Sequence, residues 1–380
     1  MFCGYLIAFT LIARNAVAEP AEAPPAASPN AALRYWPAFD LMPRSEADLA
    51  TIGDWQHAKL DESTVKLLER GRQSLNYLHA GATMPRCDWG LDLGQGPYVL
   101  LPHLARSRDL ARLACLRIRY EFQQHQPAAA VEDACDVLAC ARHTGHDAIL
   151  ISMLVQYSME RMALEALASG LDTLDSTAMK HLTDRLDHLP ASSTLADAVR
   201  TEREIDVEWA IAQVRAGGEK PDWPRIFSFV TLAEGANAGT SVDALIKSAG
   251  GTPDAVIRDL EGLVPYHDEV ANLLKTPLSQ QEFRRKTDEA RRRVDGNPFA
   301  KPMLPAFTIA YDAAASAEAR RTLLRAAIAV IERGPEAIKT FVDPVNRQPL
   351  EYTKRAEGFE LTSKAVYRDL PVTLDVGSGN

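Results

Sequence analysis

Two histidines separated by two residues, followed directly by an aspartate, form the first group in this sequence that could bind a metal. They are His143, His146 and Asp147, in the stretch HTGHD. Imidazoles three residues apart on a helix can share one ion, and an adjacent carboxylate can add an oxygen ligand. Gly145 interrupts the helix that would hold this geometry, and the spacing fixes no third ligand. We therefore favour the interpretation that these histidines cap helix carbonyls.

Acidic residues at helical spacing form a second group, in the segment TEREIDVEW at 201–209. Glu204 and Glu208 share one face of the expected helix, and Glu202 and Asp206 share another. Facing carboxylates can act as acid and base, or hold two metal ions when histidines accompany them at ExxH spacing. That spacing is absent from this segment. We expect an exposed acidic helix.

A histidine next to carboxylates, in the stretch Tyr266-His267-Asp268-Glu269, has the residue types of a general base. A nucleophile in a recognisable setting is missing from the sequence, which has neither a GxSxG motif nor an SxxK motif with its partner motifs. We expect this stretch to be a surface loop.

The Gly- and Pro-rich segment 85–103 is the fourth candidate and the one we assign as a binding site. It is too irregular for a helix, and its candidate binding residues are Asp88, Trp89, Asp92, Tyr98 and His103. Two interpretations stay open. The segment is a binding lip on a rigid helical scaffold, or it is a plug that packs Trp89 between the helices, and the second is favoured.

The elements that position these residues are mostly helices, because apolar residues recur at three- and four-residue intervals through most of the chain. A short helix at 30–43, broken at Pro37 and Pro43, comes first, and the next helix stops at Gly81. The arginines of the last helix, Arg320, Arg321, Arg325 and Arg333, are expected on its solvated face. We expect the main helices at 61–80, 107–124, 127–144, 148–169, 175–189, 194–216, 224–233, 241–248, 252–263, 279–293 and 306–333.

This series of helices with short connections predicts a mainly α fold, a solenoid-like array of antiparallel helical hairpins. The segment 125–142 is similar to part of a tetratricopeptide repeat, but the signature positions of such repeats do not recur with a 34-residue period. The break GGEKPDWP at 217–224 separates two regions. We predict a helical array at 31–216, a second helical region at 217–341, and a β-hairpin with a tail at 342–380.

The first residues predict export from the cytosol. An apolar run from Phe2 to Ile12 is followed by Ala16-Val17-Ala18, a small-x-small cleavage pattern, so we expect a signal peptide at 1–18. The Pro- and Ala-rich stretch 19–30 is an expected extended linker. Because the apolar run is shorter than the ~20 residues of a spanning helix, we expect no stable membrane span after cleavage.

Composition and charge exclude some functions. The chain has 380 residues, of which 51 are acidic and 42 basic, and the net charge of -9 has the wrong sign for a general nucleic-acid binder. Removing the leader leaves Cys87, Cys115, Cys135 and Cys140, which form either two disulfides or buried free thiols. Cys135 and Cys140 are separated by ~140° on a helix and should not pair with each other. No Cys/His spacing indicates zinc, and we expect no metal site and no cofactor.

The last forty residues have alternating character that predicts a β-hairpin, with its turn at 354–358. This hairpin resembles the C-terminal hairpin of type II secretion major pseudopilins, and the matching residues are Asp343, Pro344, Pro349, Tyr352, Gly358, Phe359, Leu361 and Ser363. That family places an acidic, calcium-holding loop next, whereas this chain has KAVYRDLPV with only Asp369. The resemblance therefore implies a hairpin fold without the calcium site.

The layout as a whole, a leader, a helical middle with a CDWGLD loop and this C-terminal hairpin, is similar to a group of exported bacterial proteins of unknown function. It implies export and a helical body and lends no catalytic residue. From the residues we predict a periplasmic or secreted, non-enzymatic interaction or scaffold protein with a protein partner in the cell envelope. The alternative is a periplasmic hydrolase or metal-dependent enzyme that uses the 85–103 loop or the pair His143 and His146.

Overall fold

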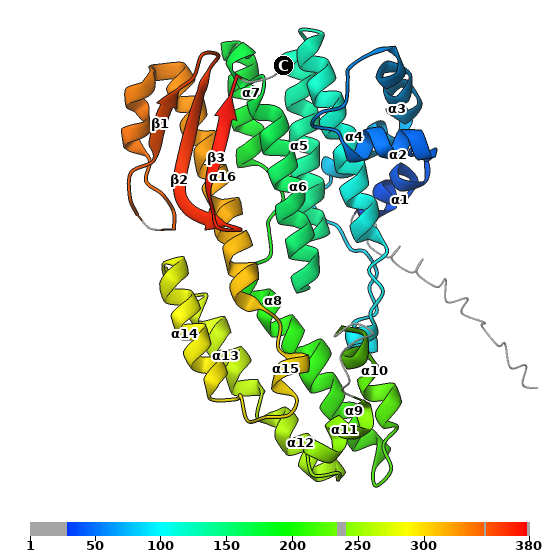
Figure 1. The fold of residues 1–380 in the computed structure, drawn as a ribbon. Coiled ribbons are helices and arrows are strands. Elements are labelled where there is room, and N and C mark those ends of the chain that lie inside the picture. The colour runs from blue at the N-terminus through cyan, green and yellow to red at the C-terminus, as the bar shows by residue number, and fades with distance from the viewer. Residues whose placement is uncertain (1–28, 234–240, 346, 378–380) are drawn as a thin grey trace, which may run out of the picture.

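The computed structural model describes residues 29–233, 241–345 and 347–377, so the expected signal peptide at 1–18 and nearly all of the expected linker at 19–30 lie outside the described residues. The described chain is mainly α-helical with a small antiparallel sheet near its C-terminal end, which confirms the expected fold class (Figure 1). Among the described residues, no helix has both the length and the apolar character needed to cross a bilayer.

One hydrophobic core fills the upper part of the molecule in Figure 1, which we call the upper body. It joins the N-terminal helices to the second half of the long helix α16 (Phe307–Arg333) and to the sheet. Its other helices are α1 (Ala32–Asp40), α2 (Glu46–Gly53), α3 (Glu62–Ala82), α4 (His103–Gln123), α5 (Pro127–Thr144), α6 (Leu150–Ala168) and α7 (Ser176–Asp187).

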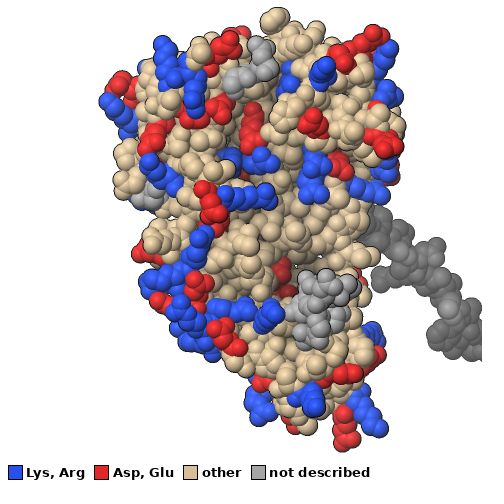
Figure 2. Space-filling model, in the orientation of Figure 1, with Lys and Arg blue, Asp and Glu red and all other residues tan. Residues whose placement is uncertain are grey.

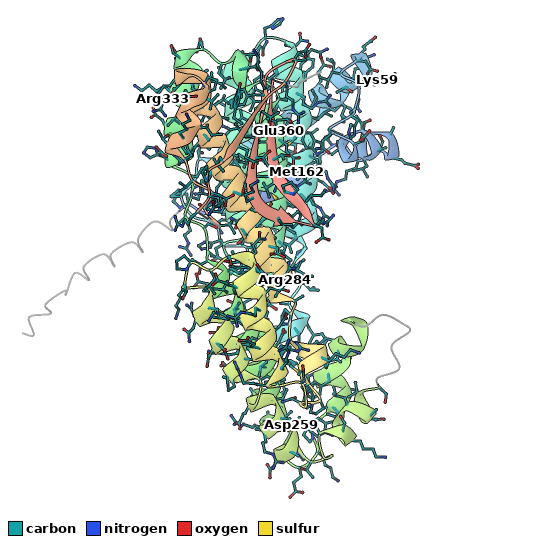
Figure 3. All side chains as sticks on the ribbon, turned by 60° about the vertical axis from the view of Figure 1, so that its left-hand side comes forward. Lys59, Met162, Asp259, Arg284, Arg333 and Glu360 are labelled. Carbon is teal, nitrogen blue, oxygen red and sulfur yellow. The ribbon has the colours of Figure 1, made fainter. Side chains whose placement is uncertain are left out.

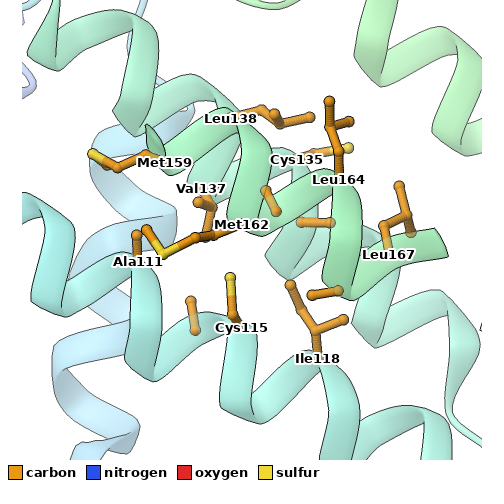
Figure 4. Close-up of a cluster of buried hydrophobic side chains, with 14 of the residues drawn as sticks. Ala111, Cys115, Ile118, Cys135, Val137, Leu138, Met159, Met162, Leu164 and Leu167 are labelled. Atoms are coloured by element: carbon orange, nitrogen blue, oxygen red, sulfur yellow. The ribbon is translucent and has the colours of Figure 1, made fainter. Parts of the chain in front are cut away.

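Small and flexible side chains let α4, α5 and α6 pack closely at the centre of the upper body (Figure 4). The side chains in this layer interdigitate without polar groups, and burying each large one stabilises the fold by about 1.5–3 kcal/mol. The labelled residues of the layer are Ala111, Cys115 and Ile118 of α4, Cys135, Val137 and Leu138 of α5, and Met159, Met162, Leu164 and Leu167 of α6.

A second hydrophobic core fills the lower body, which the first turn of α6 and the start of α16 also enter. The expected helix 194–216 is present, but a π-helical turn at Arg203–Glu208 interrupts it. The lower body consists of α8 (Leu195–Glu202), α9 (Trp209–Gly217), α10 (Trp223–Ala233), α11 (Val242–Ser248), α12 (Pro253–Glu261), α13 (Val264–Leu273), α14 (Gln280–Arg292) and α15 (Ala300–Met303).

The sheet has three antiparallel strands in the order β1 (Glu351–Lys354), β2 (Phe359–Tyr367) and β3 (Leu370–Val376). It packs against α16 and α6, and the inward residues of β2 alternate with exposed ones. The register of β2 and β3 shifts between Ser363 and Val366, which marks a bulge. The expected hairpin is β1 and β2, while β3 was not expected because the turn at Arg368–Asp369 contains no glycine to mark it.

Several local expectations were wrong. Pro37 lies inside α1, where its fixed φ suits a helix and only one backbone hydrogen bond is lost. Gly81 does not stop α3; it lies against the Tyr35 ring, and a Cβ there would come within 2.5 Å of a ring carbon. The stretch 266–269 belongs to α13, with Tyr266 and His267 buried, and is not a surface loop. The helix α2 was not expected, since its apolar pattern is weak.

The two hydrophobic cores divide the chain at a different position from the expected boundary at 216. Helices α8 and α9 pack in the lower body, so the packing divides the chain near residue 190, and α16 returns it to the upper body. The segment 85–103 connects both cores, because Trp89 packs in the upper one and Gly96 lies against Trp209 in the lower one. With φ of 61° at Gly96 and a Cβ position 2.3 Å from the indole, only glycine fits there.

Candidate functional site

Two hollows on the described surface adjoin each other at the lower end of the sheet. One, of about 760 Å³, lies between α14 and the turn that joins β2 to β3, and the other, of about 650 Å³, lies between that turn, α6 and α16. They share Ile309, Tyr367 and Arg368, so we treat them as one feature and call it the sheet-end groove. Figure 3 places Arg284, a residue of its lower wall, between Glu360 of the sheet and Asp259 of the lower body.

Four arginines line the part of the groove between the turn and the helices, and no carboxylate among the described residues lines it with them. They are Arg108 of α4, Arg161 of α6, Arg320 of α16 and Arg368 of the turn. On the face shown in Figure 2, Lys and Arg side chains gather around the lower end of the sheet and along α14. Such a wall creates a local positive potential in a chain whose net charge is -9.

These arginines are incompletely paired. The carboxylate of Glu165 lies 3.0 Å from Arg161 and 4.0 Å from Arg320, whereas Arg108 and Arg368 have no ion pair with any described residue. The Nε atoms of Arg108 and Arg320 are buried, and neither donates a hydrogen bond within the described part of the chain. Burial lowers the pKa of Arg320, and nearby Arg161 opposes the partial compensation from Glu165. Buried donors without a partner are uncommon, so these two guanidinium groups are incompletely satisfied within the fold.

Apolar side chains lie between the charged ones. Clusters of large aliphatic residues are seldom strongly exposed on a protein surface, and an exposed cluster beside polar groups is typical of an interaction surface. The exposed aliphatic residues that line the groove are Ile151 (50% exposed), Ile309 (60%), Val366 (41%) and Leu370 (68%).

The turn that divides the groove is held in an unfavourable conformation. Arg368 and Asp369 have φ of 52° and 63°, the pattern of a two-residue turn that usually contains Asn and Gly. Placing an arginine in this region costs free energy, and such strain is concentrated at functional positions. The Arg368 guanidinium lies 5.5 Å from the centre of the Tyr367 ring, which holds it beside both hollows.

The bulge in β2 precedes this turn, and the buried carboxylate of Asp343 accepts hydrogen bonds from residues at its start. Asp343 accepts a hydrogen bond from the Ser363 hydroxyl, one of 2.7 Å from the Lys364 N–H and one of 2.8 Å from the Val345 N–H. Asp343 and Ser363 are both completely buried. Asp343 thus connects the segment after α16 to the strand that carries the groove turn.

Two of the residues assigned to binding from the sequence lie in the interior. The Trp89 ring is stacked on His103 with 4.4 Å between ring centres, and it also packs on Tyr35 and Phe39. Its Nε1–H donates a 2.9 Å hydrogen bond to the carbonyl of His143. Burial lowers the pKa of His103 to about 4. These contacts agree with one of the two interpretations drawn from the sequence, in which the segment 85–103 packs Trp89 between the helices.

The other three assigned residues lie elsewhere and do not meet them. Asp88 and Asp92 are exposed and accept hydrogen bonds from backbone N–H groups two residues ahead. The Tyr98 hydroxyl lies 2.8 Å from the Ser228 hydroxyl, and its ring contacts Trp209 in the lower body. The segment therefore fastens the two bodies together, and its five assigned residues are not brought to one site.

The HTGHD stretch is divided in the same way. His143 is buried, and its Nδ1 lies 2.8 Å from the Tyr35 hydroxyl, while His146 is exposed. Burial lowers the pKa of His143 to about 4, with a smaller effect from His146. Asp147 is half-buried, and burial together with Asp88 raises its pKa to about 6. The two imidazoles therefore do not face a common ion.

The acidic segment is less exposed than expected. Glu204 and Glu208 are exposed, but Glu202 and Asp206 are partly buried on the side that faces α6. Glu202 accepts a 2.8 Å hydrogen bond from the Leu150 N–H and thereby caps the start of α6. Burial raises the pKa of Asp206 to about 8, and the Glu202 carboxylate adds to the rise.

This shift predicts a pH-dependent effect of Asp206→Asn. The unfolded chain loses the Asp206 proton near its ordinary pKa of 3.8, while the folded chain keeps it to about pH 8. Between these values the folded state binds more protons, so this group makes the fold less stable as pH rises. We expect Asp206→Asn to gain stability relative to the natural chain between pH 5 and about pH 8, measured by urea unfolding. The exposed control Glu204→Gln should show no such trend, and a constant difference for Asp206→Asn would contradict the assignment.

One group of potential metal ligands was not found from the sequence, because its members are far apart in the chain. His79 of α3 and the pair Glu132 and Asp136 of α5 each offer a ligand atom, and the three atoms lie within 4.8 Å of one another. His181 and Arg185 of α7 complete the cluster. The only signal in the sequence is the four-residue spacing of Glu132 with Asp136 and of His181 with Arg185, which is common on any helix.

The four cysteines among the described residues are free thiols in this structure. Cys87, Cys115, Cys135 and Cys140 are buried, and none of them forms a disulfide with another described residue. Burial raises the pKa of the Cys135 and Cys140 thiols to about 12, so they pack as small apolar groups.

Comparison with known proteins assigns neither a family nor a function to this chain. No family model, no curated protein and no solved structure matches the chain.

Proposed function

We propose that this chain is an exported, non-enzymatic binding protein of the cell envelope, and that an acidic segment of a partner protein binds in the sheet-end groove. The observation that carries the proposal is the incompletely paired arginine wall of Arg108, Arg161, Arg320 and Arg368 in a chain of net charge -9. The exposed aliphatic residues between these charges favour a segment that carries both carboxylates and apolar side chains.

A peptide suits the groove better than a compact anion. The two hollows, of about 760 and 650 Å³, lie on either side of the turn at Arg368 and Asp369, so an occupant that reaches both must be extended. A carboxylate can form paired hydrogen bonds with a guanidinium, and each such contact is both strong and directional.

Histidines in packing roles support a binding function over catalysis. Burial lowers the pKa of His103, His143 and His267 to about 4 each, so all three are neutral near pH 7. His103 stacks on Trp89, and His143 forms a hydrogen bond with Tyr35. The alternative enzyme on the 85–103 loop or on His143 and His146 would need these side chains to face a shared opening.

Export is supported by the apolar run and the Ala16-Val17-Ala18 pattern in the leader. The mature chain is expected to begin at Glu19. N-terminal sequencing of the chain from fractionated producing cells checks this, and recovery of an intact Met1 chain from the cytosol would contradict export.

The groove is tested with fluorescence polarisation and a labelled peptide in which Glu and Leu alternate. We expect saturable binding that weakens as salt rises, and Arg108→Gln with Arg368→Gln should weaken it by at least about tenfold, since each tenfold corresponds to 1.4 kcal/mol. Arg355→Gln is the matched control, because Arg355 lies at the opposite end of the same sheet and pairs with Glu360.

Three outcomes would count against this function. They are equal binding of a peptide in which Lys replaces Glu, undiminished binding by the double variant, and loss of binding in the Arg355→Gln control. Direct binding of inorganic phosphate or of anionic lipid vesicles, without any binding of the acidic peptide, would replace the proposed partner with a small anion or a membrane surface.

A further inference from the structure

Three helices of the upper body bring two histidines and two carboxylates together. His79 lies near the end of α3, Glu132 and Asp136 are one turn apart on α5, and His181 lies on α7. The Nδ1 atom of His79 is 2.8 Å from Asp136 Oδ2, and His181 Nε2 forms a short contact with Glu132 Oε1. Each imidazole nitrogen thus faces one carboxylate oxygen.

Arg185 holds the remaining oxygens of both carboxylates. Its guanidinium donates a hydrogen bond to Glu132 Oε2 and another, of 3.1 Å, to Asp136 Oδ1. The oxygens that face the histidines, Glu132 Oε1 and Asp136 Oδ2, are therefore turned toward them and fixed there. This is the outer hydrogen bonding that orients ligands around metal ions in proteins.

We propose that His79, Glu132 and Asp136 form a binding site for a divalent transition-metal ion of the zinc class, with His181 as the fourth ligand. The ligand atoms of His79, Glu132 and Asp136 lie within 4.8 Å of one another. His181 contacts Glu132 but lies outside this group, so its half-exposed side chain must turn toward the ion to complete the coordination. Two imidazoles and two carboxylates match the ligand set that zinc takes in four-coordinate sites. His79 and His181 bind the ion as neutral imidazoles, so the protons between His79 Nδ1 and Asp136 Oδ2 and between His181 Nε2 and Glu132 Oε1 move to the other ring nitrogen or pass to solvent.

Access and charge both favour the ion. The side chains of His79 and His181 are 53% and 44% exposed, so both can adjust to ligand distances and admit the ion from solvent, whereas Asp136 is 2% exposed and anchors the site. When both imidazoles are neutral, the two carboxylates share the single positive charge of Arg185, so a net negative charge faces the incoming cation. The bound ion would tie α3, α5 and α7 together.

The test uses untagged protein, equilibrium dialysis with Zn²⁺ and optical absorption with Co²⁺, whose visible spectrum reports tetrahedral coordination. We expect one Zn²⁺ for each chain, a tetrahedral Co²⁺ spectrum and a Zn²⁺-dependent rise in the melting temperature. His79→Ala should remove all three effects, and Arg185→Gln should weaken Zn²⁺ binding by about 10–100-fold, as expected for an outer residue.

The matched control is His57→Ala. His57 on the loop after α2 has a similar contact, 2.9 Å from Asp54 Oδ1, but its pair is exposed and belongs to no described three-ligand group. This variant should bind Zn²⁺ like the natural chain. Full binding by both His79→Ala and His181→Ala would overturn the proposal, as would the absence of Zn²⁺ from the natural chain. His79→Ala leaves Asp136 paired with Arg185, so the variant is expected to fold, and loss of the ion in a folded variant is diagnostic.

Discussion

Replacing Arg321 with alanine is expected to lower the free energy of unfolding by about 3–5 kcal/mol, the loss typical of removing one partner from a buried ion pair. Arg321 of α16 pairs with Glu160 of α6, whose side chain is 2% exposed. The remaining hydrogen bond to that carboxylate, 2.9 Å from the Gln156 amide, cannot balance a full charge in the interior. The measurement is urea unfolding followed by far-UV circular dichroism.

A surface pair one turn along the same helix provides the control. Arg325 lies 2.8 Å from Asp187, but both side chains are about half exposed, so Arg325→Ala should change stability by less than about 1 kcal/mol. In the double variant Arg321→Met with Glu160→Gln, no unpaired charge is left, and most of the lost stability should return. Equal losses for Arg321→Ala and Arg325→Ala would show that the buried pair does not hold α16 to α6.

The helices themselves were predictable because their signals are local. Pro127 at the start of α5, the Asp61 cap of α3 and the Thr194–Asp197 capping box of α8 all lie within four residues of the groups they serve. The partial burial of Arg320 and Arg321 could not be predicted from local signals. Their helical positions indicated a solvated face, but the partners that draw them inward, Glu165 and Glu160, are about 160 residues away in the chain.

The candidate sites depend entirely on such distant contacts. The groove turn at Arg368 contains no glycine, so its type I′ geometry was not predictable from the sequence, and Arg108 reaches the same hollow from a helix 260 residues earlier. Asp343 and Ser363 were named from the sequence only as positions of a resemblance, which did not predict the hydrogen bond between them. The strand bulge next to this hydrogen bond has no sequence signature of its own.

Replacing Asp343 with alanine is expected to destabilise the protein by about 3 kcal/mol or more and to weaken peptide binding in the sheet-end groove. The carboxylate accepts hydrogen bonds from the Val345 N–H, the Ser363 hydroxyl and the Lys364 N–H, and it is completely buried. Each donor left without an acceptor in the interior costs about 1–3 kcal/mol. The bulge would then lose its support, and Arg368 its position beside the arginine wall. Urea unfolding and the polarisation assay measure the two effects.

Asp343→Asn separates the hydrogen bonds from the shape of the side chain. An amide has the same size but turns an N–H donor toward donors that need an acceptor, so it should cost nearly as much stability as alanine. Ser363→Ala removes one donor to Asp343 and also the acceptor of the Ala365 N–H, while the Val345 and Lys364 N–H groups keep the carboxylate, so it should cost less than Asp343→Ala. Asp369→Asn in the exposed turn is the control and should stay within about 0.5 kcal/mol of the natural chain. If Asp343→Asn were as stable as the natural chain, the carboxylate would not be what holds the bulge, and the link from Asp343 to the groove would fail with it.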